Sequence, residues 1–319
     1  MKKLYIEDMK NGMDFIDFFM VKSAAIRTGS NQKEYLDLTL CDKTGEISSK
    51  KWDVNDGDKM LVEELNTGDI VKVKAQTNQW QGNIQLRVHR IRKANDSDGI
   101  IIEEFVKAAP ESPEFMYDYI FKTAETMVDP DFRKLSLKIL EDNKKELMYY
   151  PAASKNHHAE FGGLLYHMKR MLMSGEALCK VYTNLNRDLV LTGVIIHDME
   201  KINEIMSNRY GVSSGYTFEG QMLGHIVQGV RELGRIGEEL GISEEKIIML
   251  EHMILSHHYE PDFGSPKKPM FPEAELLHYL DILDARMFDM EEALLRVEPG
   301  GFSERVWTLD NRKIYKPTF

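Results

Sequence analysis

Apolar and polar side chains alternate along much of the first 95 residues, the period-two pattern typical of half-buried β-strands. The alternation is clearest over residues 34–40, and a turn at 42–45 leads into a second alternating run at 46–52. Further strands are predicted near residues 15–26, 70–74 and 84–89, with glycine-containing turns before the last two. About five short antiparallel strands of this kind predict a small all-β barrel of the OB type.

After this region the pattern changes to the period of amphipathic helices. Apolar faces recur over residues 222–236 and 247–254, and Pro272 is predicted to open a long helix that ends near Leu295. The segment 95–99 is polar and rich in turn-forming residues, so a domain boundary is expected there. The predicted architecture is therefore multidomain, with an OB-type domain at 1–95, a linker at 96–112 and an all-α helical bundle at 113–319.

The composition is that of a globular protein with two domains of ordinary size, since 42% of the 319 residues are hydrophobic. No run of about 18 apolar residues occurs, which excludes a transmembrane helix. The N-terminal segment turns acidic where a signal peptide needs its apolar stretch, so a cytoplasmic protein without membrane contact is expected. Cys41 and Cys179 are predicted to be buried free thiols.

The net charge of −11 is unlike that of a basic nucleic-acid-binding protein. Its distribution is uneven, because residues 1–95 carry 16 Lys and Arg against 14 Asp and Glu, whereas residues 96–319 carry 25 against 38. An acidic region is unusual in an enzyme that acts on polyanions unless some of its carboxylates bind cations. The charge distribution thus favours a cation site in the helical part.

An ordered series of histidines and aspartates runs through the helical part. Eight of the ten histidines lie between residues 157 and 258. The series consists of His167, His197-Asp198, His225, His257-His258 and Asp281. Each member lies on or at the end of a predicted helix with small or apolar neighbours, which places these polar groups inside a bundle. Any one of these histidines alone is more often a core residue, but the complete series indicates a site.

Imidazoles and carboxylates that project from several helices can bind divalent metal ions. Mixed nitrogen and oxygen ligation suits Mn, Fe, Co, Ni or Zn, and the residues alone do not choose among them. Two ions about 4 Å apart would activate water at neutral pH and hold the oxygens of an attacked phosphate. Asp198 is the natural bridging ligand because it directly follows a ligand histidine.

The series resembles that of the HD superfamily of metal-dependent phosphohydrolases. The chain is more specifically similar to the YhaM family of 3′–5′ exoribonucleases, which join an OB-type domain to an HD domain. The similarity covers nearly the whole chain and rests on the segments 150–158, 162–167, 185–189, 255–258, 264–267, 277–285 and 315–317.

The resemblance implies metal-dependent release of nucleotides from the 3′ end of single-stranded RNA, with single-stranded DNA as a second substrate class. It places the metal ligands on His167, His197, Asp198, His225, His257, His258 and Asp281. Asp198 and Lys201 are the expected catalytic residues, with the Lys201 cation close to the substrate phosphate. One departure occurs at Glu200, where the family usually has glycine, and a surface substitution is favoured over an additional ligand.

Further candidates lie outside the series. Asn156, His157 and His158 are expected at the substrate, although His157 and His158 could instead cap a helix. Asp284 follows Asp281 on the same helix face and is expected to orient a histidine ligand. In the barrel, a surface of cations and an aromatic ring is expected to contact single strands, and it consists of Lys72, Lys74, Trp80 and Arg87. Lys267, in a basic loop, either contacts the substrate backbone or belongs to a plain connection.

Two other functions remain compatible with the residues, and so does a homo-oligomer. The first is an HD hydrolase of small nucleotides or cyclic dinucleotides, which the strand-binding module disfavours. The second is a non-catalytic DNA- or RNA-binding protein that uses the helical domain as a scaffold, which the complete ligand series disfavours.

Overall fold

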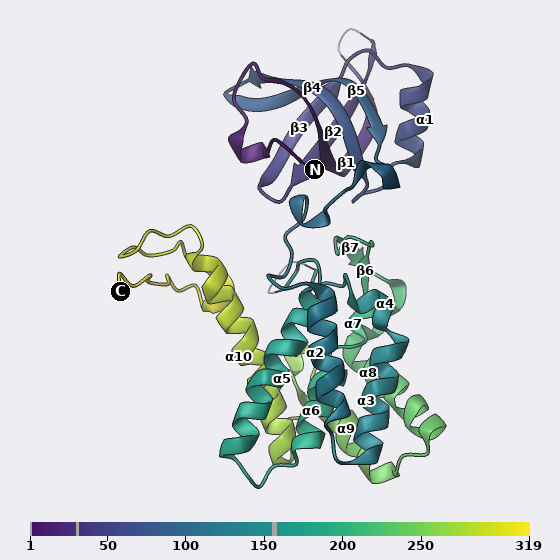
Figure 1. Cartoon of the computed structure of the whole chain (residues 1–319), viewed down its shortest axis with the longest axis vertical. Helices are drawn as coiled ribbons and strands as arrows, with labels where there is room; N and C mark the ends of the chain where they lie inside the picture. The colour runs from purple at the N-terminus through teal and green to yellow at the C-terminus, as the bar shows by residue number, and fades with distance from the viewer. Residues whose placement is uncertain (1, 30–31, 155–157) are drawn as a thin grey trace. The chain divides into compact units, whose positions relative to one another are not determined.

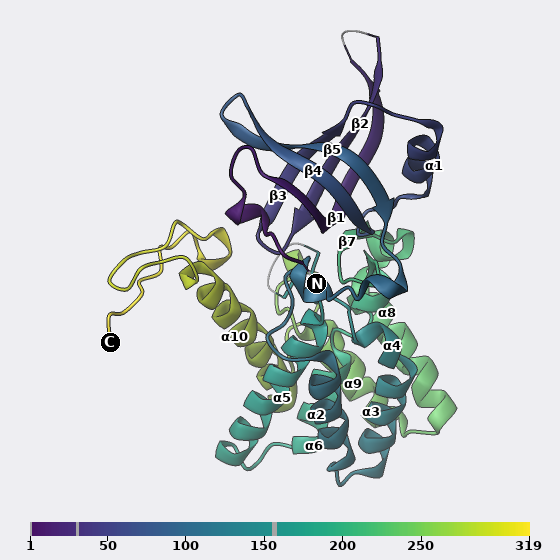
Figure 2. The ribbon, with the colours of Figure 1, turned by 45° about the horizontal axis from the view of Figure 1, so that its top comes forward.

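The computed structural model describes residues 2–29, 32–154 and 158–319, without the side chain of Asp96. The chain folds into two compact units, Met1–Ala108 and Ala109–Phe319. Figures 1 and 2 show a β-structure in the first unit and helices in most of the second. The predicted combination of an OB-type barrel and a helical bundle is confirmed.

The first unit is a closed five-stranded barrel with the strand order β1-β2-β3-β5-β4, in which β4 also pairs with β1. Its strands are β1 (Asp14–Thr28), β2 (Glu34–Asp42), β3 (Gly45–Lys51), β4 (Ile70–Trp80) and β5 (Asn83–Lys93). All pairs are antiparallel except β3 with β5. Alternate residues of each strand fill the interior, which includes Phe19, Leu36, Leu38, Leu40, Val71 and Val73. Helix α1 (Asp56–Glu64), which Asn55 and Asp58 cap reciprocally, was not predicted from the sequence.

The segment expected to be a linker, 96–112, is divided by the boundary between the two units. Residues 96–108 belong to the unit of the barrel rather than forming a free connection. Asp98 forms a bidentate ion pair with Arg92 on β5, at 2.7 and 2.8 Å, and Phe105 is buried. A polar, turn-rich composition identified the end of the last strand, but these contacts tie the following residues to the barrel.

The second unit packs its helices around one hydrophobic core. In chain order they are α2 (Pro113–Glu125), α3 (Pro130–Asp142), α4 (Lys144–Leu147), α5 (Gly163–Val181), α6 (Arg187–Ile196), α7 (Lys201–Glu204), α8 (Phe218–Leu240), α9 (Glu244–Ser256) and α10 (Pro272–Leu294). The unit also contains a short hairpin of β6 (Ile205–Ser207) and β7 (Ser213–Tyr216), which the hydrophobic pattern did not predict.

Helix starts follow the local sequence signals. Ser112, Asp129 and Asn186 each cap the helix that follows by accepting a backbone N–H, and proline occupies the first turn of α2, α3 and α10. Among the described residues, none of the helices is both long and apolar enough to cross a membrane.

Candidate metal centre

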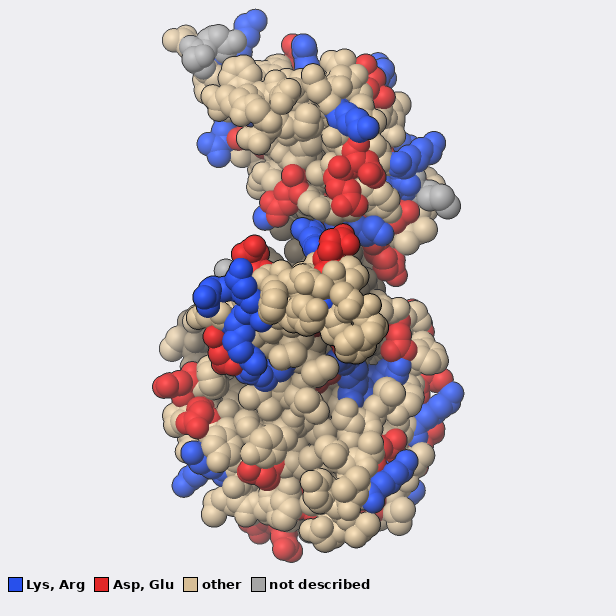
Figure 3. Space-filling model, turned by 90° about the vertical axis from the view of Figure 1, so that its left-hand side faces the viewer, with Lys and Arg blue, Asp and Glu red and all other residues tan. Residues whose placement is uncertain are grey.

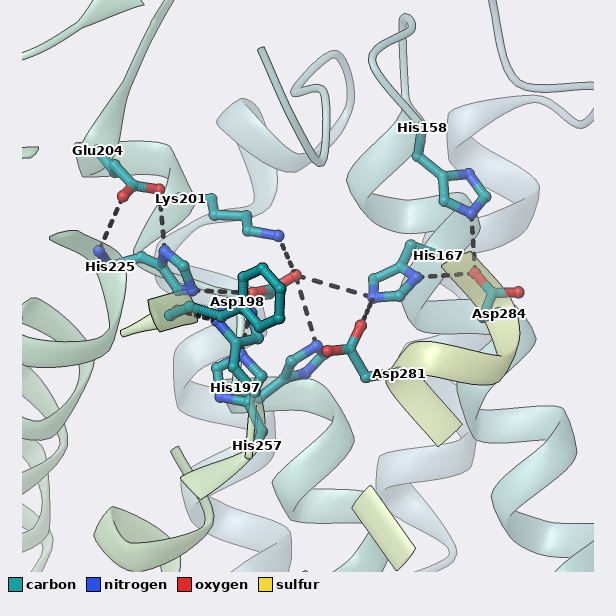
Figure 4. Close-up of polar contacts among 12 residues, drawn as sticks. His158, His167, His197, Asp198, Lys201, Glu204, His225, His257, Asp281 and Asp284 are labelled. Carbon is teal, nitrogen blue, oxygen red and sulfur yellow. Dashed lines mark hydrogen bonds and ion pairs between the residues drawn. The ribbon is translucent and has the colours of Figure 1, made fainter. Parts of the chain in front are cut away.

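Five helices bring the predicted histidines and aspartates together in the interior of the second unit (Figure 4). The side chains come from α5 (His167), the end of α6 (His197 and Asp198), α8 (His225), the end of α9 (His257 and His258) and α10 (Asp281). The Asp198 carboxylate lies at the centre of the cluster. Its Oδ1 is 3.4 Å from His225 Nε2 and 3.8 Å from His257 Nε2. Its Oδ2 is 3.4 Å from His197 Nε2, and 3.8 Å from His167 Nε2.

Asp281 joins the cluster through His167, whose Nε2 is 3.4 Å from Asp281 Oδ1. Among the described residues, three groups of possible ligand atoms are close enough to hold a cation, and Asp198 belongs to two of them. One of these two contains His167, His197 and Asp198, and the other contains Asp198, His225, His257 and His258. The third consists of His158, His167 and Asp284. Residues separated by more than a hundred positions in the chain therefore converge on one place.

Two glycines lie next to ligands of the cluster. Gly193 lies one turn before His197, and a Cβ there would be 2.3 Å from Cε of Met253, so a larger residue would require the flexible end of the Met253 side chain to move. Gly224 precedes His225 and has φ of 69° and ψ of 163°, which interrupts α8. Because φ is positive, a larger residue would be strained at position 224. The interruption separates the first turns of α8 from the helical segment that begins at His225.

The Nδ1 atoms of the cluster histidines all bind acceptors. Those of His197, His257 and His258 contact the backbone carbonyls of residues 194, 254 and 263 at 2.9, 2.7 and 2.6 Å. A carbonyl only accepts, so Nδ1 carries the hydrogen in these rings and the neutral ring keeps its lone pair on Nε2. In His225 and His167 the Nδ1 acceptors are carboxylates, Glu204 at 2.9 Å and Asp284 at 2.8 Å. This pattern is typical of metal-binding histidines.

Several atoms at the centre of the cluster are buried and have no hydrogen-bond partner among the described residues. They are Nε2 of His197, His225 and His257 and Oδ1 of Asp198. Leaving such atoms without a partner is costly. A divalent cation binds lone pairs of imidazole and carboxylate, so the donor set fits a metal ion.

The charge states also suit a cation site. Burial lowers the pKa of His197 and of His257, which keeps both rings neutral. Burial alone would raise the pKa of Asp198, but Lys201 and the surrounding histidines hold it well below its usual range. Neutral imidazoles and an ionised carboxylate are the forms that bind metal.

His167 has a different balance of charge. Burial lowers its pKa, but the hydrogen bonds and negative charges of Asp281 and Asp284 outweigh burial and raise the pKa of His167 to about 10. In the metal-free protein this ring is therefore a cation between two carboxylates. A bound metal ion would replace the proton on Nε2, so metal binding is expected to release it.

Asp284, which the sequence suggested as a partner of a histidine ligand, lies against His167. Its Oδ2 accepts from His167 Nδ1 and from His158 Nε2, each at 2.8 Å, and its Oδ1 lies 2.5 Å from Arg170 Nε. His158 is fully buried against the ring of Phe288, away from the solvent-facing position expected of a substrate contact. The other two residues expected there, Asn156 and His157, lie outside the described residues.

Glu204 was not identified from the sequence. It is the last residue of α7, and its carboxylate accepts from both Nδ1 and the backbone N–H of His225, at 2.9 and 3.2 Å. Burial would raise its pKa, but these bonds lower it, so Glu204 stays ionised. The two residues are 21 positions apart, and no short motif joins them. Arg170, which pairs with Asp284, was missed for the same reason.

Removing the Glu204 carboxylate should weaken metal binding. We expect Glu204→Ala to raise the dissociation constant for Mn²⁺ by roughly 10- to 100-fold, because the ring of His225 loses the acceptor that orients it. Calorimetric titration of the metal-free protein measures this. Glu219→Ala is the matched control, since Glu219 is an exposed carboxylate in the first turn of α8 that pairs with Arg231. Equal affinities of both variants and the wild type would contradict the expectation.

Lys201 lies beside the central carboxylate. Its Nζ donates to Asp198 Oδ2 at 2.5 Å, and its side chain is 12% exposed. Burial lowers the pKa of Lys201, but Asp198 and Asp281 raise it by more, so the side chain is a cation. Glu200, the departure from the usual family motif, accepts from Asn203 Nδ2 at 2.6 Å and is absent from all three groups of ligand atoms.

The barrel residues singled out from the sequence lie on the neighbouring strands β4 and β5. Lys72 and Lys74 pair across β4 and β5 with Arg92 and Arg90. A bulge after Lys74 shifts the register, so Arg87 lies farther along β5, beside Lys50 on β3. Trp80 and Lys267 are exposed. On the face drawn in Figure 3, basic and acidic side chains are interspersed on both units, so charge alone does not mark a nucleic-acid path there.

A cation and two aromatic rings on β2 and β3 were not identified from the sequence. The rings of Tyr35 and Trp52 are 4.9 Å apart, and the Lys50 ammonium lies 5.3 and 5.9 Å from them. Trp52 is 47% exposed. Tyr35 and Trp52 are far apart in the chain, and the pairing of β2 with β3 brings them together.

Comparison with known proteins divides the chain into the same two domains, a barrel and a helical domain. Residues 20–94 match the OB-fold nucleic acid binding domain family, and residues 164–286 match the HD domain family. The chain is 42% identical to the 3′-5′ exoribonuclease YhaM of Geobacillus sp. (strain WCH70), over 95% of this chain and 91% of the relative. It is 40% identical to the 3′-5′ exoribonuclease YhaM of Bacillus subtilis (strain 168), over 95% and 94%. A solved OB-fold domain of replication protein A from Methanococcus maripaludis matches 29% of this chain and 95% of that chain, with 19% identity and a TM-score of 0.24.

Proposed function

The chain belongs to the YhaM family of 3′–5′ exoribonucleases, and from this premise we propose that its His–Asp cluster hydrolyses the 3′-terminal phosphodiester of single-stranded RNA with the help of divalent metal ions. The observation that carries the proposal is the set of buried lone pairs without a partner, three imidazole Nε2 atoms and Asp198 Oδ1. Single-stranded DNA is a second substrate class of the same chemistry.

The two groups of ligand atoms that contain Asp198 favour two metal ions over one. They share only Asp198, so this carboxylate would serve both ions. His167 and His197, together with Asp281, would hold one ion, and His225, His257 and His258 would hold the other. A mixed set of imidazoles and carboxylates suits Mn²⁺, which we favour, as well as Fe, Co, Ni or Zn.

When bound, divalent cations activate water and offset the charge that develops on an attacked phosphate. The protein's own groups position the reactants. Asp284 and Glu204 fix the rings of His167 and His225. Lys201, a cation beside Asp198, attracts a non-bridging phosphate oxygen and stabilises the added negative charge. His158 binds Asp284, so we place His158 among the residues that orient the metal ligands rather than at the substrate.

The barrel binds the single strand, as the OB-fold family match supports. Bases stack on exposed aromatic rings and cations neutralise the backbone. Tyr35, Lys50 and Trp52 offer both in one place, with Arg87 beside Lys50. We propose this group as the principal contact and Trp80, Lys72, Lys74 and, in the helical unit, Lys267 as further contacts.

Loss of one exposed ring should weaken RNA binding without affecting the fold. We expect Trp52→Ala to cost roughly 1–3 kcal/mol of binding free energy for an oligonucleotide, the usual value of one stacked base. Fluorescence anisotropy with a labelled RNA in the presence of a chelator measures the affinity without hydrolysis. Trp307→Ala is the matched control, because Trp307 is an exposed ring in the helical unit. An affinity for Trp52→Ala equal to that of the control would contradict this assignment.

The proposed function is tested with the full chain, Mn²⁺ and single-stranded RNA. A 5′-labelled RNA should shorten progressively from its 3′ end, and a 3′-labelled RNA should release its label in the first product. A panel of nucleotides and cyclic dinucleotides tests the first alternative. Turnover of that panel without turnover of RNA would identify a small-nucleotide hydrolase, and binding of RNA without any turnover would identify a scaffold.

A further inference from the structure

Gln228 is a buried side chain of α8 whose amide has no hydrogen-bond partner among the described residues. It is 1% exposed, and neither Oε1 nor Nε2 has a partner. A buried amide without partners is costly, and native proteins seldom retain one without a reason. None of the described residues completes Gln228, which leaves a water molecule or a ligand as its partner in this part of the chain.

The position of Gln228 in α8 connects it with the His–Asp cluster. It follows His225 by three residues in a segment with helical backbone, so both side chains project from the same face. The adjacent Gly229 lies close to two segments of the cluster. A Cβ at that position would be 3.2 Å from Ile254, whose carbonyl accepts from His257, and 3.9 Å from Glu200, which is two residues after Asp198.

His225, on the same helix face as Gln228, belongs to a set of buried atoms that also lack hydrogen-bond partners among the described residues. Nε2 of His225 and of His257 and Oδ1 of Asp198 lack hydrogen-bond partners, as both ends of Gln228 do. Bound cations would be partners for the imidazole and carboxylate lone pairs. They cannot be partners for Nε2 of an amide, which only donates hydrogen bonds. Gln228 therefore needs a different partner from its neighbours.

The two ends of the amide restrict what that partner can be. A phosphate oxygen only accepts, so it satisfies Nε2 and leaves Oε1 unpaired. A water molecule donates to Oε1, and water is the second reactant of a hydrolysis. A substrate phosphate and the water that attacks it lie next to each other, and together they satisfy both ends.

We propose that Gln228 is a positioning residue for the hydrolysis, with Oε1 accepting a hydrogen bond from the attacking water and Nε2 donating to a non-bridging oxygen of the attacked phosphate. The water oxygen forms the new bond to phosphorus while the bond from phosphorus to the leaving sugar oxygen breaks. That oxygen takes up one proton, and the second proton of the water goes to solvent. An amide that orients an attacking water is a known device in phosphoryl transfer. The inference rests on the proposed function.

Gln228→Met tests it, because Met has a similar length and shape but lacks both polar ends. Three quantities are measured on the full chain: kcat and KM with single-stranded RNA and Mn²⁺, the Mn²⁺ dissociation constant, and the melting temperature of the metal-free protein. We expect kcat to fall by roughly 10²-fold, the usual effect of one lost positioning hydrogen bond in a transition state. KM and the Mn²⁺ affinity should not change. The melting temperature should be no lower than that of the wild type, since an unpaired amide has been replaced by an apolar group.

Gln228→Leu provides a second apolar variant, and Gln221→Met is the matched control, an exposed glutamine on the same helix. A purely structural Gln228 would give unchanged kcat in both variants, and that result overturns the inference. A lower kcat that comes with weaker Mn²⁺ binding or a lower melting temperature overturns it as well. If the wild type hydrolyses RNA and Gln228→Met does so equally fast, only this inference fails. If the wild type does not hydrolyse RNA, the proposed function fails together with it.

Discussion

Asp198→Asn should reduce kcat for RNA degradation by roughly 10³-fold or more, which corresponds to about 4 kcal/mol of activation free energy. Asp198 is shared by two of the groups of ligand atoms, and its carboxylate is the nearest anionic partner of Lys201. Asparagine has a similar shape but no charge, so it neither bridges two cations nor balances the lysine. The measurement is single-turnover hydrolysis of a 5′-labelled RNA at saturating Mn²⁺.

Loss of folding must be separated from loss of chemistry in this experiment. Asn at position 198 leaves the Lys201 cation largely buried without its partner, and an unpaired buried charge destabilises a protein. The melting temperature of the variant is therefore measured together with its activity. Asp142→Asn is the control, because Asp142 is an exposed carboxylate that pairs with Lys138. A folded Asp198→Asn variant with the activity of this control would contradict the central role of Asp198.

Adding Mn²⁺ to the metal-free protein should raise the melting temperature of the helical unit. At a free concentration 100 times the dissociation constant, binding to the native state alone stabilises it by about 2.7 kcal/mol. For a unit of this size that corresponds to a rise of roughly 5–10 °C. The physical reason is that the cation supplies partners for Nε2 of His197, His225 and His257. Differential scanning calorimetry of the chelator-treated chain, with and without Mn²⁺, measures the shift.

The sign of the pH dependence follows from competition between protons and the cation for the same lone pairs. Because the pKa of His167 is raised to about 10, Mn²⁺ must displace a proton from this ring below that pH, so at a fixed Mn²⁺ concentration the shift should become smaller as pH falls from about 8.5 to about 6. Asp198→Asn should show a much reduced shift at every pH, and Glu219→Ala should behave as the wild type. A melting temperature that does not respond to Mn²⁺, or responds equally in Asp198→Asn, would contradict the metal centre.

The sequence alone was sufficient for the class and order of the two units, and it named the histidines and aspartates that the structure brings together in one cluster. Period-two alternation identifies strands such as residues 34–40 because a barrel strand has one face inside and one outside. The central histidines and aspartates were also identifiable, since each lies in an apolar helical segment where a lone polar group is costly. Their recurrence as an ordered series made the site visible without any knowledge of distances.

The tertiary structure decided which side chains contact and orient the residues of the His–Asp cluster. Glu204 and Arg170 have ordinary surroundings in the sequence, and only the packing of the helices brings them to His225 and Asp284. The packing of the helices also brings His158 to Asp284 and buries it there. In the barrel, a bulge after Lys74 sets the position of Arg87.

The physical reason is the range of the interactions. Burial patterns and helix caps depend on neighbours within a few positions, so the local sequence determines them. A hydrogen bond such as that of Glu204 with His225, or a ring pair such as Tyr35 with Trp52, depends on the register and approach of whole elements. The chemistry of the site was therefore determined by residue types along the sequence, and its orientation by the fold.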